Sequence, residues 1–281
     1  MKKENQTDAS VRSGTDSLKM ECRALWYELI HTRILLRVSL LYMLLLCALT
    51  LIISMELEDE GLAKTASNMM VENPDIIYVF SNLVIGLLVG SIAGGDLKDK
   101  VANYELMAGH SRKNVFLSRS LVATLFSAAV LTVAGFATVL FATIVYGFGD
   151  AITPGGLAVR LGLMFFPYLR IAAFLTLVAF AARGKYLPMV FGMLYTYLVM
   201  ILETVGGSND YATGYFSLRH VMDFTTWQTY NISPVKGIVE YYAYDASVSA
   251  SLAVETIGIS LLMTAVYLMI GYALFRRDDL N

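Results

Sequence analysis

Few side chains that could do chemistry lie inside the apolar stretches of this sequence. Three ionisable residues do so, namely Arg170, Glu203 and Glu255. A charge inside an apolar helix is costly unless it is paired or hydrated, and such residues often mark a functional position. We therefore expect Arg170 to pair with Glu203, with Glu255 as the alternative partner. The pair could be structural or could gate a cavity, and the sequence leaves both roles open.

Motifs of common enzyme active sites are absent. There is no G-x-x-x-x-G-K-S/T phosphate loop, no H-E-x-x-H pair and no G-x-S-x-G turn. Of the histidines, His31 and His110 are expected on the cytosolic side and His220 outside, far apart in the topology, so no shared metal site is expected. Cys22 and Cys47 are treated as small apolar residues rather than as a disulfide. These features predict no enzyme, no metal site and no cofactor bound by this chain.

The composition indicates the surroundings of the chain. Of the 281 residues, 57% are hydrophobic and only 16% are charged, and the mean hydropathy is +0.60. Soluble domains are about half apolar and about a quarter charged. The formal net charge of -2 gives no reason to expect a nucleic-acid partner. We therefore expect an all-α integral membrane protein whose main contact is the lipid bilayer.

Six apolar runs are suited to form transmembrane helices, because the hydrocarbon core of a bilayer needs about 20 residues of helix. In chain order they are Val38–Met55, Ile76–Gly95, Leu121–Phe148, Leu161–Ala182, Tyr186–Leu202 and Ser247–Phe275. The sequence thus predicts six spans, the fourth of which is interrupted by Pro167 and Arg170.

The distribution of basic residues predicts the orientation, since Lys and Arg collect in cytosolic loops. They gather before the first expected span, between the second and third, between the fourth and fifth, and after the sixth. Acidic residues crowd the loop after the first span instead. We therefore expect a multi-pass protein of the cell inner or plasma membrane with both termini in the cytosol.

The N-terminal region divides into two segments before the spans begin. Residues 1–15 are polar and predict a disordered cytosolic tail. In residues 16–37, apolar side chains recur at helical spacing, and Trp26 and Tyr27 suit the headgroup level. This pattern predicts an amphipathic elbow helix on the inner leaflet. Residues 38–277 would then form the six-span domain.

Two connections between spans are also distinctive. Residues 96–110 predict a short cytosolic helix over Leu97–Met107, polar on one face and apolar on the other, with Ser111 starting the next helix. Such a helix suits docking into a groove of a partner protein. The extracellular region at residues 205–246 is too long and too aromatic for a structureless loop. We expect short helices at the outer face there.

Glycines repeat every fourth residue in the second expected span, at Gly86, Gly90 and Gly94. Such a stripe of small residues allows two helices to approach closely. The partner helix could belong to the same chain or to a second subunit, and the sequence leaves both possibilities open.

Three sequence segments carry a resemblance to a known family. They are GGDLKDKVANYELMAGHSRKNVFLSR at Gly94–Arg119, LWYELIHTRILL at Leu25–Leu36 and YALFRRDDL at Tyr272–Leu280. The first is similar to the connection between spans two and three of type-2 ABC transporter permeases. The second resembles the N-terminal elbow of that family and the third its basic C-terminal end. The family comprises six-helix export subunits, including bacitracin- and lantibiotic-immunity permeases.

The resemblance implies a transport function without enzymatic activity in this chain. A dimer of cytosolic ABC ATPase subunits would bind ATP and Mg, and a second permease subunit, the same or homologous, would complete the pore. The cargo would be a peptide, as in antimicrobial peptide immunity, a lipid or a hydrophobic drug. The helix at residues 96–110 would be the coupling helix that the ATPase moves. Residues implied in this coupling are Asp96, Leu97, Val101, Tyr104, Glu105, Met107, Arg112 and Glu28.

Two other classes of function stay open from the residues alone. One is a membrane enzyme at the outer face, which would need polar residues that converge within the spans. The other is a membrane sensor or scaffold that transports nothing.

Overall fold

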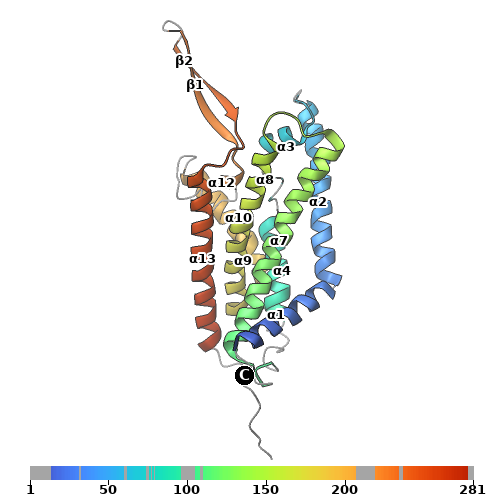
Figure 1. Cartoon of the computed structure of the whole chain (residues 1–281), viewed down its shortest axis with the longest axis vertical. Helices are drawn as coiled ribbons and strands as arrows, with labels where there is room; N and C mark the ends of the chain where they lie inside the picture. The colour runs from blue at the N-terminus through green and yellow to red at the C-terminus, as the bar shows by residue number, and fades with distance from the viewer. Residues whose placement is uncertain are drawn as a thin grey trace, which may run out of the picture.

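Helices make up most of the described chain, which comprises residues 14–31, 33–59, 62–73, 76, 78, 80–95, 105–107, 110–206, 219–233 and 237–277. The long helices of this computed structural model run side by side as a bundle, and a β-hairpin projects from one end (Figure 1). We call this the hairpin end and the opposite one the α1 end. The elements in chain order are α1 (Gly14–His31), α2 (Arg33–Asp59), α3 (Ala66–Glu72), α4 (Ser81–Val89), the π-helical turn η2 (Gly90–Gly94), α7 (Arg112–Tyr146), α8 (Pro154–Leu163), α9 (Phe165–Ala182), α10 (Leu187–Gly206), α12 (Arg219–Met222), β1 (Thr225–Ser233), β2 (Gly237–Tyr244) and α13 (Ala250–Arg277).

Four helical stretches in the described part of the chain are long and apolar enough to cross a membrane. They are Leu35–Asp59, Arg112–Tyr146, Pro154–Ala182 and Ala250–Arg277. The second and fifth expected spans correspond to shorter apolar helices, Ser81–Gly94 and Leu187–Val199. The long helices expose large apolar side chains, such as Leu41 (68% exposed), Ile144 (75%) and Val254 (70%). Lipid tails cover such faces and water does not, so the chain is membrane-embedded.

The centre of the bundle is α9, which contacts α13, α7, α10 and α4. Near its C-terminal end, the ring of Phe180 lies 4.6 Å from that of Phe116 in α7 and 5.3 Å from that of Phe275 in α13. Two turns earlier, the ring of Phe174 lies 5.9 Å from Tyr195 of α10 and 5.5 Å from Tyr267 of α13. Helix α9 is therefore the element against which α4, α7, α10 and α13 pack, whereas α1 and α2 pack against α7.

Proline and a left-handed residue set the limits of α8 and α9. Helix α8 begins with Pro154, whose missing N–H costs nothing at the first helical position. The helix is interrupted at Met164, because Pro167 lacks an N–H group and its ring crowds the carbonyl of the preceding turn. Arg183 then ends α9 in the left-handed region, with a φ of 47°, and the chain turns into α10.

The amphipathic N-terminal segment is a helix of its own. Figure 1 shows α1 crossing α7 obliquely and meeting α2 at the edge of the bundle. Trp26 makes an edge-to-face contact with Phe126 of α7, with ring centroids 6.0 Å apart. Because α2 already begins at Arg33, the bend falls before residue 37, where the elbow was expected to end. Residues 1–13 of the expected tail lie outside the described residues.

The expectation of short helices between residues 205 and 246 is corrected over most of the described segment. Helix α12 has only four residues. Strands β1 and β2 pair in antiparallel register, with Thr225 opposite Tyr244 and Asn231 opposite Ile238. Both strands are rich in β-branched and aromatic residues, which favour an extended backbone.

Candidate functional site

Polar side chains join three segments at the α1 end of the bundle. Oε1 of Glu21 in α1 lies 2.6 Å from Nδ1 of His110, which precedes α7. The other oxygen, Oε2, accepts a hydrogen bond of 3.3 Å from Oγ of Ser118 in α7. One carboxylate therefore links α1, the connection before α7 and α7 itself.

An ion pair between a buried arginine and a partly exposed glutamate lies in the same place. Arg119 of α7 has no exposed surface (0%), and its Nη2 lies 3.0 Å from Oε1 of Glu105. The distance is that of an ion pair, although the nitrogen is not aimed at the carboxylate as in a hydrogen bond. A buried charge strongly favours keeping its counter-ion, so this pair holds Glu105 against α7. We call the whole set the junction: Glu21, Glu105, His110, Ser118 and Arg119.

The start of α7 positions the junction residues. Ser111 is its N-cap, and Oγ of Ser111 accepts a hydrogen bond of 3.2 Å from the N–H of Asn114. The helix start predicted at Ser111 is thus confirmed. The N–H of His110 donates to the carbonyl of Glu105 at 3.1 Å. This bond sets Glu105 and His110 at either side of one turn, close to the first two turns of α7.

Only part of the predicted coupling segment can be placed. Leu106 packs against the core, whereas its neighbour Met107 is 83% exposed. With Glu105 paired to Arg119, the described part of the connection is anchored on one side and presents Met107 on the other. Of the predicted coupling residues, those outside the described part of the chain are Asp96, Leu97, Val101 and Tyr104.

The other two predicted coupling residues lie at the same end. Nη1 of Arg112 donates to the backbone carbonyl of Arg276 at 3.2 Å, which ties the start of α7 to the end of α13. Glu28 lies on the exposed side of α1. The α1 end therefore joins α1, α7, α13 and the connection before α7 through polar contacts.

The predicted intramembrane charge Arg170 is buried in α9, at 4% exposure. Its side chain hydrogen-bonds Tyr195 of α10 and lies near Tyr267 of α13. Glu255, the alternative partner, is exposed and lies about 18 Å from Tyr267 along α13. The side chain of Glu203 lies outside the described residues. The structure thus brings Arg170 to tyrosine hydroxyls from two neighbouring helices.

The glycine stripe lies against the start of α10 and the turn before it. A Cβ on Gly86 would approach Cα of Met189 to 2.6 Å, and one on Gly90 would approach the carbonyl oxygen of Lys185 to 2.1 Å. A Cβ on Gly94 would similarly meet the carbonyl oxygen of Gly184 at 2.8 Å. The stripe is therefore filled by the backbone of the same chain.

The same helix pair has a second feature that the sequence analysis did not single out. Gly192 of α10 would place a Cβ 2.3 Å from the carbonyl oxygen of Asn82 in α4. Nδ2 of Asn82 also donates to Oγ1 of Thr196 at 2.8 Å. A polar bond between two apolar helices needs close backbones, which glycines on both sides provide.

Arg160 of α8 is a further residue whose role the sequence analysis missed. Its side chain is buried, at 6% exposure. The guanidinium donates hydrogen bonds to backbone carbonyls, and its Cζ lies 4.9 Å from the centre of the Phe224 ring. The acceptors are the carbonyls of Ala246 at 3.1 Å, Val221 at 3.1 Å, Asp223 at 2.5 Å, Asp245 at 3.2 Å and Ser247 at 2.9 Å. Arg160 therefore fastens the chain on both sides of the hairpin to α8. The feature of the sequence that could have identified this residue is a single arginine within an apolar run.

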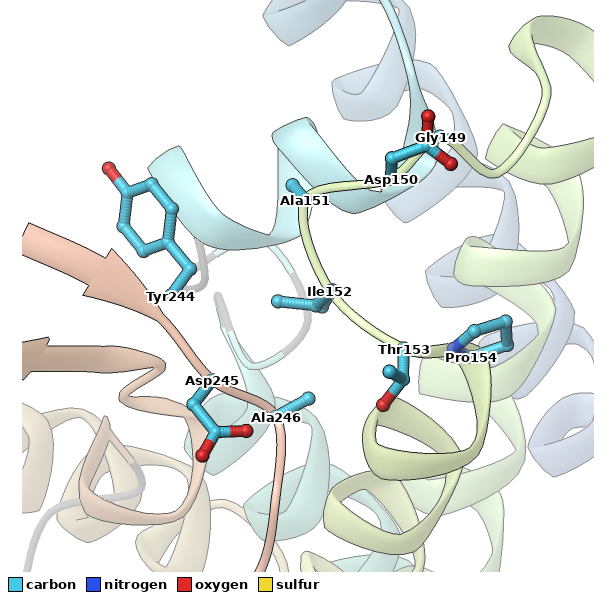
Figure 2. Close-up of a pocket in the computed structure, with 9 residues that line it drawn as sticks. All are labelled: Gly149, Asp150, Ala151, Ile152, Thr153, Pro154, Tyr244, Asp245 and Ala246. Atoms are coloured by element: carbon cyan, nitrogen blue, oxygen red, sulfur yellow. The ribbon is translucent and has the colours of Figure 1, made fainter.

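A hollow of about 300 Å³ lies at the hairpin end, beside the segment that Arg160 holds. Figure 2 shows the loop at residues 149–154 on one side of it and Tyr244, Asp245 and Ala246 on the other. The N–H and Oγ of Ser247 donate to the Asp245 carboxylate and, with the nearby Arg160, hold the pKa of Asp245 below its usual range. The Asp245 carboxylate is thus engaged by Ser247, and Asp150 is the other carboxylate that lines the hollow.

The other reactive side chains are dispersed. Cys22 and Cys47 are both free, and burial with the nearby Glu21 raises the pKa of the Cys22 thiol. Among the residues that the structure describes, no three side chains of His, Cys, Asp or Glu lie close enough to hold a metal ion.

Comparison with known proteins adds no relative. No protein-family model matches the sequence, and no curated protein matches it.

Proposed function

We propose that the chain is the membrane-spanning subunit of an ABC-type exporter, driven by ATP hydrolysis on a separate cytosolic chain. The observation that carries the proposal is the junction. Through the Glu21–His110 contact and the Glu105–Arg119 pair, the connection before α7 is joined to both α1 and α7. A partner that moved this connection would move two helices with it.

Six membrane crossings are part of the proposal. They would be α2, α4 with η2, α7, α8 with α9, α10 and α13. The charge distribution supports this topology. Figure 1 shows the start of α7 and the end of α13, which carry Arg112, Lys113, Arg276 and Arg277, at the α1 end. It shows α3 and the end of α2, which carry Glu72, Glu56 and Glu58, at the hairpin end. The α1 end would face the cytosol of the cell that carries the protein in its inner or plasma membrane.

The coupling step follows from the contacts at the α1 end. An ATPase subunit would bind the exposed side of the connection around Met107 and the exposed face of α1 around Glu28. Its movement on ATP hydrolysis would pass through Glu105 and Arg119 to α7, and through His110 and Glu21 to α1. Packed helices respond to such a push by shifting as units, which could open the bundle toward the other side.

Co-purification tests this function. The tagged chain would be isolated from its native membrane in mild detergent and assayed for ATP hydrolysis. A co-purifying ATPase, whose activity changes when candidate peptides, lipids or hydrophobic drugs are added, is the expected result. If the chain is recovered intact, with no ATP-hydrolysing subunit at any detergent or salt condition that keeps it folded, the exporter function is wrong.

A further inference from the structure

The corner between α1 and α2 carries an arginine pair beside exposed leucines. Arg33 and Arg37 are one helical turn apart at the start of α2, and both are exposed. Leu36 and Leu40, at 47% and 58% exposure, share their face of the helix. These four side chains line a shallow hollow of about 240 Å³.

The charges of this pair are not used inside the protein. Among the described residues, neither Arg33 nor Arg37 has a hydrogen-bond or ion-pair partner. A guanidinium presents its N–H donors in a planar fork that matches the oxygens of a phosphate. Two such groups one turn apart form a site for an anionic phosphate group.

The position of the pair along α2 favours a phosphate that belongs to a lipid. The apolar stretch of α2 begins at Leu35, so the two arginines lie at the level where the hydrocarbon region ends and headgroups begin. Beyond Leu40, the exposed face continues with Leu44 at 58% exposure and Ile52 at 54%. An acyl chain could lie along these side chains while its headgroup meets the arginines.

The neighbouring end of α1 also suits the headgroup region. Trp26 and Tyr27 are 46% and 65% exposed, and the ring of Tyr27 stacks on His31 at 3.9 Å. Tyr and Trp favour this level of a bilayer because each combines an apolar ring with a polar group. Figure 1 places the α1–α2 corner at the edge of the bundle, where lipid has access.

We infer that the α1–α2 corner binds an anionic phospholipid, with its phosphate held by Arg33 and Arg37 and an acyl chain along Leu36, Leu40 and Leu44. The site does not require that the chain transports anything. A lipid held at this corner would fix the angle between α1, which belongs to the junction, and the first expected span. The composition of the surrounding leaflet would therefore affect the position of α1.

Native mass spectrometry of the purified full chain tests the site. The protein would be titrated with phosphatidylglycerol, with zwitterionic phosphatidylcholine and with inorganic phosphate. The variant of the proposed site is Arg33→Gln/Arg37→Gln. The matched control is Arg276→Gln/Arg277→Gln, a second exposed arginine pair, at the end of α13. Equal melting temperatures of the three proteins would establish that each is folded.

The expected result is retention of phosphatidylglycerol over phosphatidylcholine by the wild type. Affinity should fall about fivefold for each arginine removed, and so about 25-fold for the pair. The control should bind as the wild type does, and millimolar phosphate should not displace the lipid. Unchanged lipid retention by the Arg33→Gln/Arg37→Gln variant, an equal loss in the control, or displacement by inorganic phosphate would each overturn the inference.

Discussion

Oε1 of Glu21 lies 2.6 Å from Nδ1 of His110, although 89 residues separate them along the chain. The contact joins the N-terminal helix to the connection before α7, and the Glu105–Arg119 pair joins that connection to α7. The two contacts fix the connection at both of its described ends. The junction is therefore the feature through which an external force on this segment would reach the helices.

The Glu105–Arg119 ion pair at the junction should contribute measurably to the stability of the protein. Replacing Glu105 by Gln leaves the guanidinium of Arg119 buried beside a neutral amide. Because Glu105 is about a third exposed, we expect a loss of about 1–2 kcal/mol rather than the full effect of a buried charge. The double-mutant cycle with Arg119→Gln, measured by thermal unfolding in detergent, should show a coupling of about 1 kcal/mol. Additive effects of the two substitutions would contradict the pairing; Glu56→Gln, exposed at the hairpin end, is the control.

Weakening the Arg160 clamp, by which we mean its hydrogen bonds to the five backbone carbonyls, should loosen the chain on both sides of the hairpin. Lysine at this position keeps the charge but concentrates its donors on one nitrogen, which cannot reach five carbonyls. Arg160→Lys should destabilise the protein by about 2–4 kcal/mol. Amide hydrogen exchange should rise at residues 219–224 and 245–249, with little change in α7. Exchange that stays at the wild-type rate in these two segments would show that the clamp is dispensable, and Arg277→Gln controls for the loss of a surface arginine.

Replacing Gly90 by alanine should destabilise the protein, whereas replacing Gly258 should not. In Gly90→Ala, the new Cβ would lie 2.1 Å from the carbonyl oxygen of Lys185, so η2, which continues α4, must move away from the turn that leads into α10. We expect a destabilisation of about 1–3 kcal/mol. Gly258→Ala in α13 meets nothing within 4 Å and should be neutral or stabilising by up to about 1 kcal/mol. A stable Gly90→Ala protein with unchanged melting would refute the close contact between η2 and this turn.

The hydroxyl of Tyr195 should contribute more to the stability of the fold than the hydroxyl of Tyr197. Tyr195→Phe removes the hydrogen bond to the buried guanidinium of Arg170 and should cost about 1.5–3 kcal/mol. Tyr197→Phe, on the same helix and 59% exposed, should change stability by less than about 0.5 kcal/mol. Arg170→Met should abolish the difference between the two phenylalanine variants. A persistent difference in that background would mean that Tyr195 acts through another group.

Apolar segments and helix ends could be predicted well from the sequence because they depend on neighbouring residues. The N-cap at Ser111, for example, needs only a side-chain oxygen three residues before a free N–H. Six spans were expected, and four of them are helices long and apolar enough to cross a membrane in the described part of the chain, a property that depends only on length and composition. Both are local properties of the chain.

Relationships between distant residues could not be predicted in the same way. Nothing near Arg160 in the sequence indicates that its acceptors are carbonyls 61 to 87 residues away. Backbone carbonyls carry no sequence signature, so a side chain that binds them shows only as an isolated charge. Likewise, the sequence did not indicate the hydrogen bond between Arg170 and the hydroxyl of Tyr195, because the simplest rule pairs a buried arginine with a carboxylate.

The β-hairpin shows a second reason why a prediction from sequence failed. Aromatic residues between 225 and 244 suit both an interfacial helix and a strand, and the membrane setting favoured the helix. The alternation of β-branched and aromatic residues in Thr225–Ser233 and Gly237–Tyr244 was the competing signal. Strand pairing prevailed because two such segments are adjacent in the chain.

Site-specific cross-linking at Met107 tests the central claim most directly. In a Cys22→Ala/Cys47→Ala background, Met107→Cys would present a single thiol on the 83% exposed side of the connection, with Asp150→Cys at the hairpin end as the matched control. A thiol-directed photo-cross-linker applied in native membranes should join the Met107→Cys chain, and not the control, to an ATP-hydrolysing subunit. Cross-links to such a subunit from Asp150→Cys alone, or from neither position in a folded and membrane-inserted chain, would contradict the proposal that this connection is driven by a partner ATPase.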